Sequence, residues 1–386
     1  MGSRLKNPSG EIRFLGILLN VELRTGAHRR YLELMDGLAE AGHSVTVLCS
    51  PAAADCLSVA TAVILPHDSC YKTRAFQFRQ MVKIWVQQVG TNEFDWVLVH
   101  GETHFFAGAY LSRTCNARLL FAYRSNTAEE LRLRRRYLRI DLKTAFGSLL
   151  KQLKIHGYEQ LVGLLAHSIS FQSPVDHDEI ARRIPWARSR MTIVPGNIGG
   201  PRFPEHLANS NTSREMKRII YVGGLGWRKG VDNLLYAFAD AKRNIPDLRL
   251  DIVGFGDLEE SLKRLARDLS IDEAVLFHGR KPEPLQMIAQ SDLVAIPSLF
   301  DSFPDTVLEA LHVGTPVIGS HVGGIPHQIG SEDFLFPPAD PKTLSSLFVK
   351  LAQDDVFYQR AREHARQQAE LFRFDWVNAW LDSLQD

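Results

Sequence analysis

The sequence predicts an α/β protein of two domains, and three observations lead to this prediction. The chain has 386 residues, more than one hydrophobic core usually fills. Short apolar runs alternate with longer stretches of helical periodicity, the pattern of parallel strands joined by crossover helices. The alternation starts again after residues 205–217, a polar stretch without apolar periodicity that suits a linker. We therefore expect two similar halves, each with its own parallel sheet.

The first half, residues 11–204, predicts a Rossmann-like domain. Residues 11–20 have the character of a buried strand, and residues 28–42 have the periodicity of a helix that ends at Gly42. The elements expected after them are strands at 44–49 and 95–100, a helix at 104–113 and a strand at 118–123. Residues 1–10 are expected to form a disordered tail.

The second half, residues 217–368, repeats this organisation, and residues 369–386 add a terminal helix. The expected strands are 218–224, 248–254, 274–279, 292–298 and 316–320, and the expected helices include 230–244, 257–270 and 305–314. Open parallel sheets bind ligands at the carboxyl ends of their strands. Two such domains facing each other predict an interdomain cleft that holds the functional site.

Composition excludes several classes of protein. The chain has 45% hydrophobic and 23% charged residues and a formal net charge of +1, so nothing favours a nucleic-acid partner. Four cysteines form no zinc or redox spacing and are expected to be reduced thiols: Cys49, Cys56, Cys70 and Cys115. The first apolar run is too short and interrupted for a signal peptide or membrane span, so we expect a cytoplasmic protein.

Residues 127–156 break the alternation with a dense basic cluster. Its members are Arg132, Arg134, Arg135, Arg136 and Arg139. Two interpretations are open: a solvated helix face, or peripheral contact with an anionic surface, either the inner face of a membrane or an acceptor.

Residues 301–320, DSFPDTVLEALHVGTPVIGS, hold two acids eight residues apart, Asp301 and Glu309. A helix that begins near Pro304 would offer free N–H groups and its dipole to an anion. Eight residues correspond to ~12 Å along a helix, about the length of a sugar, a diphosphate and a ribose. Glu309 would then accept hydrogen bonds from a ribose and Asp301 from a sugar. The alternative is that Asp301 or Ser302 caps the helix and Glu309 faces solvent.

The surroundings of these acids carry a family resemblance. Residues 301–326, DSFPDTVLEALHVGTPVIGSHVGGIP, resemble the acid-x7-Glu segment of retaining GT-B glycosyltransferases of glycosyltransferase family 4, the glycosyl transferases group 1. Members usually have Glu at the first acid, and the shorter Asp301 is expected to alter sugar preference. The resemblance implies that the donor also contacts the residues between the two acids, namely Phe303, Pro304, Asp305 and Thr306.

Other segments resemble the same family in the same order. YVGGLGWRKGVDNLLYAFADA resembles the strand, loop and helix that carry a donor-phosphate lysine, which implicates Lys229. VLFHGRKPEPLQMIAQSDLVAIPS resembles the segment that contacts the base, so His278, Gly279 and Arg280 would border the nucleobase through backbone groups.

The match in the first half is looser. RTGAHRRYLELMDGLAEAGHSVTVL resembles the family's glycine loop and first helix, with Thr25 and Gly26 where two glycines are common. Gly26 would let the backbone approach the donor phosphates, and an ordinary turn glycine is the alternative. TIVPGNIGGPRF resembles the segment before the linker with the order of Asn and Gly exchanged, at Gly196 and Asn197, and is interpreted as structural.

Two departures from the family pattern bear on the chemistry. The family commonly has an arginine where this chain has Gly224, and Arg228 is a candidate replacement because guanidinium binds phosphate in a bidentate manner. Many relatives also carry a histidine after the strand at 118–123, where this chain has RSNTAEE. The candidates near the sugar or acceptor are Arg124, Asn126, His100 and His104, with structural roles as the alternative.

The resemblance implies a GT-B fold and retaining transfer of a sugar from a nucleotide donor, with UDP favoured and GDP as an alternative. The acceptor would be a hydroxyl of a glycan, lipid-linked or natural-product molecule. Lys229, Arg228 and Asp301 are the expected catalytic residues, and no metal or other cofactor is expected. In relatives the terminal helix packs back on the first domain. A non-catalytic pseudo-glycosyltransferase scaffold and a GT-B epimerase or pseudo-disaccharide coupling enzyme are the rival interpretations.

Overall fold

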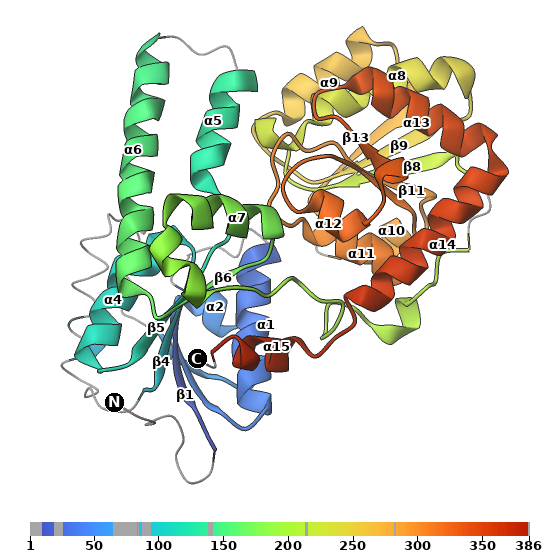
Figure 1. The fold of residues 1–386 in the computed structure, drawn as a ribbon. Helices are drawn as coiled ribbons and strands as arrows, with labels where there is room; N and C mark the ends of the chain where they lie inside the picture. The colour runs from blue at the N-terminus through green and yellow to red at the C-terminus, as the bar shows by residue number, and fades with distance from the viewer. Residues whose placement is uncertain are drawn as a thin grey trace.

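The computed structural model describes residues 10–18, 26–64, 83, 85–86, 94–137, 142–212, 215–281 and 283–384. It contains two parallel sheets, each covered by helices, and this confirms the predicted α/β architecture of two Rossmann-like halves (Figure 1). The predicted N-terminal tail as far as residue 9, and the residues Thr25, Cys70 and Arg139, lie outside the described residues.

The first sheet has seven strands in the order β3-β2-β1-β4-β5-β6-β7, and all the pairs are parallel. Its strands are β1 (Arg13–Leu18), β2 (Ser44–Cys49), β3 (Thr61–Ile64), β4 (Trp96–His100), β5 (Arg118–Ala122), β6 (Ser168–Phe171) and β7 (Met191–Ile193). The helices of this half are α1 (Gly26–Glu40), α2 (Pro51–Ala54), α4 (Phe105–Thr114), α5 (Thr127–Tyr137), α6 (Leu142–Leu165) and α7 (Pro174–Arg183).

The second sheet has six parallel strands in the order β10-β9-β8-β11-β12-β13. Its strands are β8 (Arg218–Val222), β9 (Arg249–Val253), β10 (Val275–Gly279), β11 (Leu293–Ile296), β12 (Val317–Ser320) and β13 (Leu335–Phe336). The helices are α8 (Val231–Asn244), α9 (Glu259–Asp268), α10 (Leu285–Ala289), α11 (Asp305–Val313), α12 (Ile325–Ile329), α13 (Pro341–Gln353) and α14 (Asp355–Leu371).

The strands are almost continuously buried, which is why they appear in the sequence as apolar runs rather than as alternating patterns. Trp96–His100 is buried at all five positions, and Leu293–Ile296 at all four. Both faces of a parallel sheet are covered by crossover helices, so both sets of side chains must be apolar. Residues 198–372 contribute one large core, and two smaller clusters lie on the two faces of the first sheet.

The chain crosses between the two halves twice. Ile198 and Phe203, inside the range predicted for the first domain, pack in the core of the second, so the first crossing lies earlier than expected. Helix α14 runs through residue 368 to Leu371, and α15 (Trp376–Asp382) then lies against α1 (Figure 1). Trp376 and Trp380 bury their rings there, and the indole of Trp376 donates a hydrogen bond to the Pro195 carbonyl at 3.0 Å.

Helices α5 and α6 account for the break in alternation at residues 127–156. They stand side by side and project from the first domain (Figure 1). The Arg135 guanidinium on α5 donates to the Ser148 hydroxyl at 3.0 Å and to the Gln152 amide oxygen, both on α6. None of the helices within the described ranges combines the length and the hydropathy of a membrane-spanning helix.

Both sheets share one topological feature that positions the site. In each sheet the chain builds outward from its first strand and then returns to the other side of that strand, so the order reverses between β1 and β4 and between β8 and β11. Ligands of open α/β sheets bind at the carboxyl ends of the strands next to this reversal. The loops after these four strands are therefore where the site is sought.

Candidate active site

In the second domain, the loops after β8 and β11 are joined by their backbones. The Leu299 N–H donates to the Arg228 carbonyl at 2.7 Å. Gly230 lies at φ +61, and a Cβ there would meet the Pro297 carbonyl oxygen at 2.1 Å, so only glycine allows this approach. As a result Lys229 Nζ lies 2.5 Å from Asp301 Oδ2, and both side chains are mostly buried. Two residues predicted from separate motifs are thus in direct contact.

Helix α11 starts where the sequence predicts, near Pro304, but only one of the two acids lies on it. The helix begins at Asp305, Pro304 is its N-cap in an extended conformation, and Asp301 lies in the preceding loop. The two acids are therefore not spaced along one helix. The loop is held instead by the Gly323–Gly324 turn, because a Cβ on Gly323 would be 1.8 Å from the Asp301 carbonyl oxygen. Asp301 is consequently directed to Lys229, and only Glu309 lies on the helix.

Asp305, the first residue of α11, joins the two domains through charge. Its carboxylate accepts a hydrogen bond from Arg30 of α1 and another, at 3.2 Å, from Arg202. Arg202 Nε also lies 3.1 Å from Glu33 of α1. Burial alone would raise the pKa of Asp305, but the two guanidinium groups hold it below its ordinary value. This cluster of charged groups lies at the helix start where donor phosphates were predicted.

Gly26 adjoins the same helix start from the first domain. A Cβ on Gly26 would lie 2.1 Å from Asp305 Oδ2, which is closer than any side chain tolerates. The absence of a side chain therefore lets the start of α1 approach the start of α11. The predicted proximity of Gly26 to this part of the cleft agrees with the geometry, while phosphate binding by its backbone stays a prediction.

Glu309 lies one turn further along α11 and is half-buried. Burial raises the pKa of Glu309 to about 7, against the lowering influence of Arg202. Asp305, Arg30 and Arg29 are the other charged groups that act on it. Glu309 therefore changes its ionisation near neutral pH, which makes its predicted role as a ribose ligand testable.

We expect UDP to bind about tenfold more weakly at pH 5.5 than at pH 7.5, because a carboxylate accepts two ribose hydrogen bonds and a carboxylic acid accepts fewer. Isothermal titration calorimetry at the two pH values measures this change. Glu309→Gln should flatten the difference while leaving the titration of UDP itself unchanged. The stability of the protein without ligand changes with pH in the opposite direction. Because the pKa of Glu309 is raised in the folded state, Glu309 contributes to stability at low pH, and this contribution is lost as pH rises from 4.5 to 7. If UDP binding to Glu309→Gln keeps the pH dependence of the wild type, Glu309 is not the ribose ligand.

The first domain contributes three imidazoles and one guanidinium, from the start of α1, the end of β4, the turn that follows β4 and the loop after β5. Arg124 Nη1 lies 3.0 Å from His28 Nε2, and a Cβ on Gly101 would lie 2.7 Å from Arg124 Cδ. Burial, and secondly Arg124, lower the pKa values of His28 and His104 to about 4. His100 is shifted well below its ordinary pKa for the same reasons. At neutral pH these imidazoles are uncharged hydrogen-bonding groups near the half-buried Arg124 cation.

Arg124 and Arg228 approach each other from the two domains. Burial and then the charge of the Arg228 guanidinium lower the pKa of Arg124, so these like charges from the two domains act on each other. Within the described part of the chain, the half-buried Arg228 side chain has no hydrogen bond or ion pair. Arg228 and its chain neighbour Lys229 in the second domain, with Arg124 in the first, supply cations that favour a multiply charged anion.

The other predicted donor residues occupy the ends of β8 and β10. Gly224 is exposed, and a Cβ there would meet nothing closer than 4.0 Å, so no steric reason requires glycine. The His278 imidazole lies 2.5 Å from Asp251 Oδ1, so its side chain is already engaged. Its backbone, at the end of β10, is the part that remains for a ligand. Gly279 has φ +64, and the Arg280 guanidinium lies 5.4 Å from the centre of the Phe255 ring.

Four predicted residues already have structural contacts within the protein. Phe303 packs in the core against Phe372, and the Pro304 carbonyl accepts from the Gln328 amide at 3.1 Å. The Thr306 hydroxyl donates to the Val222 carbonyl at 3.1 Å. Asn126 accepts from the Glu129 N–H at 3.2 Å at the start of α5, and its amide donates to Glu179 at 2.5 Å. For Phe303 and Thr306, only the backbone remains for a ligand.

Sequence patterns missed several residues that the fold brings to the cleft. Arg30, Arg202 and His28 lie inside segments that resemble the family, but the sequence analysis assigned none of them to the site. Asp176 on α7 is buried near Asp301 and Ser302, and burial raises its pKa to about 6. The spacing of α1 places Arg30 and Glu33 one turn apart, but the partners on α11 are far away in the sequence and carry no local signal.

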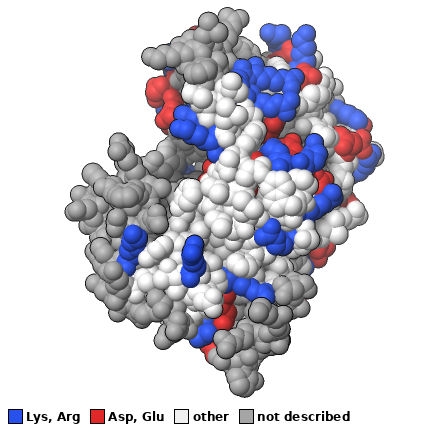
Figure 2. All heavy atoms as spheres, turned by 60° about the vertical axis from the view of Figure 1, so that its left-hand side comes forward, with Lys and Arg blue, Asp and Glu red and all other residues white. Residues whose placement is uncertain are grey.

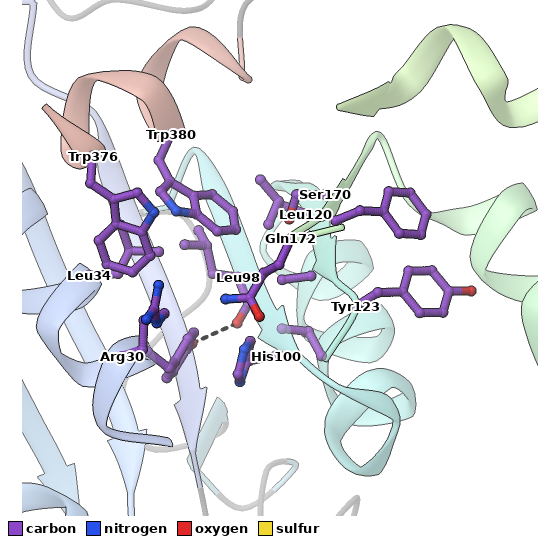
Figure 3. Close-up of a pocket in the computed structure, with 14 residues that line it drawn as sticks. Arg30, Leu34, Leu98, His100, Leu120, Tyr123, Ser170, Gln172, Trp376 and Trp380 are labelled. Atoms are coloured by element: carbon purple, nitrogen blue, oxygen red, sulfur yellow. Dashed lines mark hydrogen bonds between the residues drawn. The ribbon is translucent and has the colours of Figure 1, made fainter. Parts of the chain in front are cut away.

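A small cavity lies beneath the tryptophans of α15, and Arg30 and His100 are part of its lining (Figure 3). The centre of a water molecule can occupy about 20 Å³ in it, which is room for one or two waters. Six buried polar atoms of its lining have no hydrogen-bond partner among the described residues: Arg30 Nε and Nη1, His100 Nδ1, Tyr123 Oη, Ser170 Oγ and Trp380 Nε1. Buried polar groups of this kind are normally satisfied by ordered water.

Comparisons with known proteins identify relatives of this chain. Residues 203–368 match the family model described as glycosyl transferases group 1. The N-acetyl-alpha-D-glucosaminyl L-malate synthase of Bacillus anthracis is 31% identical over 175 residues, 45% of this chain and 46% of that protein. A D-inositol 3-phosphate glycosyltransferase of Corynebacterium aurimucosum is 36% identical over 177 residues, 42% and 41% of the two chains. The chain spans about half the length of the curated relatives that it matches.

Solved structures resemble the chain over nearly its whole length. Anabaena HepE, whose structure holds UDP and glucose, has a TM-score of 0.73 at 16% identity over 97% of this chain and 99% of that one. WaaG, a glycosyltransferase involved in lipopolysaccharide biosynthesis, has a TM-score of 0.72 at 17% identity over 96% and 98%. The chain therefore has the GT-B fold, and residues 203–368 match the glycosyl transferases group 1 family.

Proposed function

We propose that this protein is a glycosyltransferase that moves a sugar from a nucleotide-sugar donor to an acceptor hydroxyl. The observation that carries the proposal is the contact of Lys229 Nζ with Asp301 Oδ2 at 2.5 Å, beside Arg228 in the same loop. Cations at this position match the charge of a diphosphate, and an adjacent carboxylate matches the hydroxyls of a sugar.

Each group has a proposed role along the donor. Glu309 accepts hydrogen bonds from the ribose, and the first-turn N–H groups of α11 with Lys229 and Arg228 hold the diphosphate. Asp301 binds hydroxyls of the transferred sugar, and His278, Gly279 and Arg280 border the base. UDP is the favoured carrier, because HepE has the same fold and its structure holds UDP and glucose. GDP is the alternative.

In the proposed reaction, the bond between the anomeric carbon and the β-phosphate oxygen breaks, and a bond to the acceptor oxygen forms on the same face. The acceptor proton passes to the departing phosphate oxygen. Lys229 and Arg228 stabilise the negative charge that grows on the diphosphate, and we propose that these residues replace a metal ion in this role. Among the described residues, no group of three or more His, Cys, Asp or Glu is arranged to hold a metal.

The acceptor would bind against the first domain, beside His100, His104 and Arg124. A glycan, a lipid-linked sugar and a natural product all present the required hydroxyl. The chemistry of this pocket favours an acceptor that hydrogen-bonds to neutral imidazoles and adds an anionic group to meet Arg124.

A panel of UDP-, GDP- and ADP-sugars tests the proposal by thermal shift combined with release of the nucleotide. A ligand at about 100 times its dissociation constant should stabilise the protein by ~2.7 kcal/mol. We expect UDP-sugars to give the largest shift, and Glu309→Ala to reduce it. If no nucleotide sugar shifts the melting temperature, the proposal fails. Binding without any release of nucleotide would favour the non-catalytic scaffold.

A further inference from the structure

The outward face of α6 is apolar. Six leucines recur at helical spacing over more than four turns of the helix, and each side chain is 39% to 66% exposed. They are Leu149, Leu150, Leu153, Leu161, Leu164 and Leu165. Monomeric proteins rarely leave a continuous apolar stripe of this kind in water, so it marks a surface that contacts something else.

The opposite face of α6 packs against the rest of the first domain. The exposed leucines are therefore not the face by which this helix joins the hydrophobic core. Val162 is fully buried in the core of the first domain. Glu159 is also buried, and its carboxylate accepts from Arg183 Nε at 2.8 Å. A surface helix normally has an apolar inner stripe and a polar outer one. Here the inner face is satisfied and the outer face is apolar as well.

Two exposed aromatic side chains extend the leucine face. Phe106 of α4 is 49% exposed, and its ring lies 6.2 Å from that of Tyr158 on α6. Trp186 is 52% exposed, and its indole lies beside Gly163 of α6. Figure 2 shows this side of the molecule, where a broad area of uncharged side chains is bordered by Lys and Arg.

The charges next to the leucine face are predominantly positive. Lys151 and Lys154 are exposed on α6, and the single acid of this helix is the buried Glu159. Residues 127–165 hold eight Lys and Arg against four Asp and Glu, whereas the whole chain holds 45 against 44. Arg132, Arg134 and Arg136 are exposed on the neighbouring α5. A basic border around an apolar stripe complements a surface that is both anionic and hydrophobic.

We propose that the leucine face of α6 docks the protein on an anionic lipid bilayer, with the helix lying in the plane of the surface. Leucines, Trp186 and Phe106 enter the boundary between headgroups and acyl chains, and the lysines and arginines meet anionic headgroups. A second copy of the chain fits the charges less well. A two-fold contact would bring this basic border against itself. The inference stands apart from the proposed sugar transfer, because binding to lipid needs no donor.

Co-sedimentation of the full chain with vesicles tests the inference, using phosphatidylcholine alone and phosphatidylcholine with 30% phosphatidylglycerol. We expect binding to the anionic vesicles, and a decrease of at least about tenfold in L153E/L164E, because two apolar side chains leave the interface and two like charges enter it. Lys151→Gln and Lys154→Gln should each weaken binding about fivefold on the anionic vesicles alone. The matched control is V356E/L371E, which changes two apolar residues on α14 that are more exposed than Leu153 and Leu164.

Circular dichroism should show that L153E/L164E is as folded as the control, because both leucines are exposed in the native protein. Absence of wild-type binding to anionic vesicles at low salt would overturn the inference. So would an equal loss of binding in the control variant. Size-exclusion chromatography supplies the third outcome: a wild-type dimer that L153E/L164E converts to monomer would show that a second copy covers the face instead.

Discussion

Lys229→Ala is expected to lower kcat about 10²- to 10³-fold, with a smaller effect on donor affinity. Lys229 Nζ lies 2.5 Å from Asp301 Oδ2, where the diphosphate and the sugar meet in the proposed complex. Its charge matters most when the bond to the β-phosphate breaks, since negative charge then grows on the leaving group. The measurement is donor turnover under saturating nucleotide sugar.

Lys217→Ala is the matched control for this variant. Lys217 also pairs with a carboxylate at 2.5 Å, that of Glu215, but both side chains are well exposed and far from the cleft. Turnover should be unchanged in Lys217→Ala. If Lys229→Ala retains wild-type turnover, Lys229 has no part in the chemistry. If it weakens donor affinity but leaves turnover at saturating donor unchanged, its role is uniform binding of the donor.

Asp305→Asn is expected to give the largest loss of stability, about 3 kcal/mol in the free energy of unfolding. The change removes the carboxylate shared by Arg30 and Arg202. Arg30 is 3% exposed and would be left as a buried cation without a hydrogen-bonded acid. Urea denaturation measures the effect, and Asp355→Asn at the exposed first turn of α14 is the matched control.

The same cluster predicts the direction of acid lability. Arg30 and Arg202 hold the pKa of Asp305 below its ordinary value, so the stability that this carboxylate contributes is present at neutral pH. It is lost as pH falls through the native pKa. Wild type and Asp305→Asn should therefore converge in stability at low pH. A constant difference in stability between pH 7 and pH 3 would show that the charge of Asp305 is not the stabilising feature.

The fold was predictable from the sequence because the strands are buried on both faces. The runs around β1, β4, β8 and β11 are almost wholly apolar, and the helices between them carry clear periodicity. The first crossing between the domains was placed too late, since Ile198 and Phe203 follow no strand or helix pattern of their own. Only their packing in the second core assigns them.

The site was predictable where motifs are local. Lys229 and Asp301 were expected to serve one donor, and the loops after β8 and β11 bring them together. Arg30 and Arg202 were not expected, since their partner Asp305 is more than a hundred residues away from each of them. The exchanged order at Gly196 and Asn197 now has a physical reason: a Cβ on Gly196 would lie 1.6 Å from Arg30 Nη1.

The central claim, that this cleft breaks the bond between a sugar and a nucleoside diphosphate, is tested most directly by proton NMR of the donor without acceptor. The nucleotide sugar that gives the largest thermal shift is incubated with enzyme, and the anomeric signals are followed. The account predicts slow release of the free sugar in the anomeric configuration of the donor, and its loss in Lys229→Ala. Release no faster than in buffer, or equal release by Lys229→Ala, would contradict it.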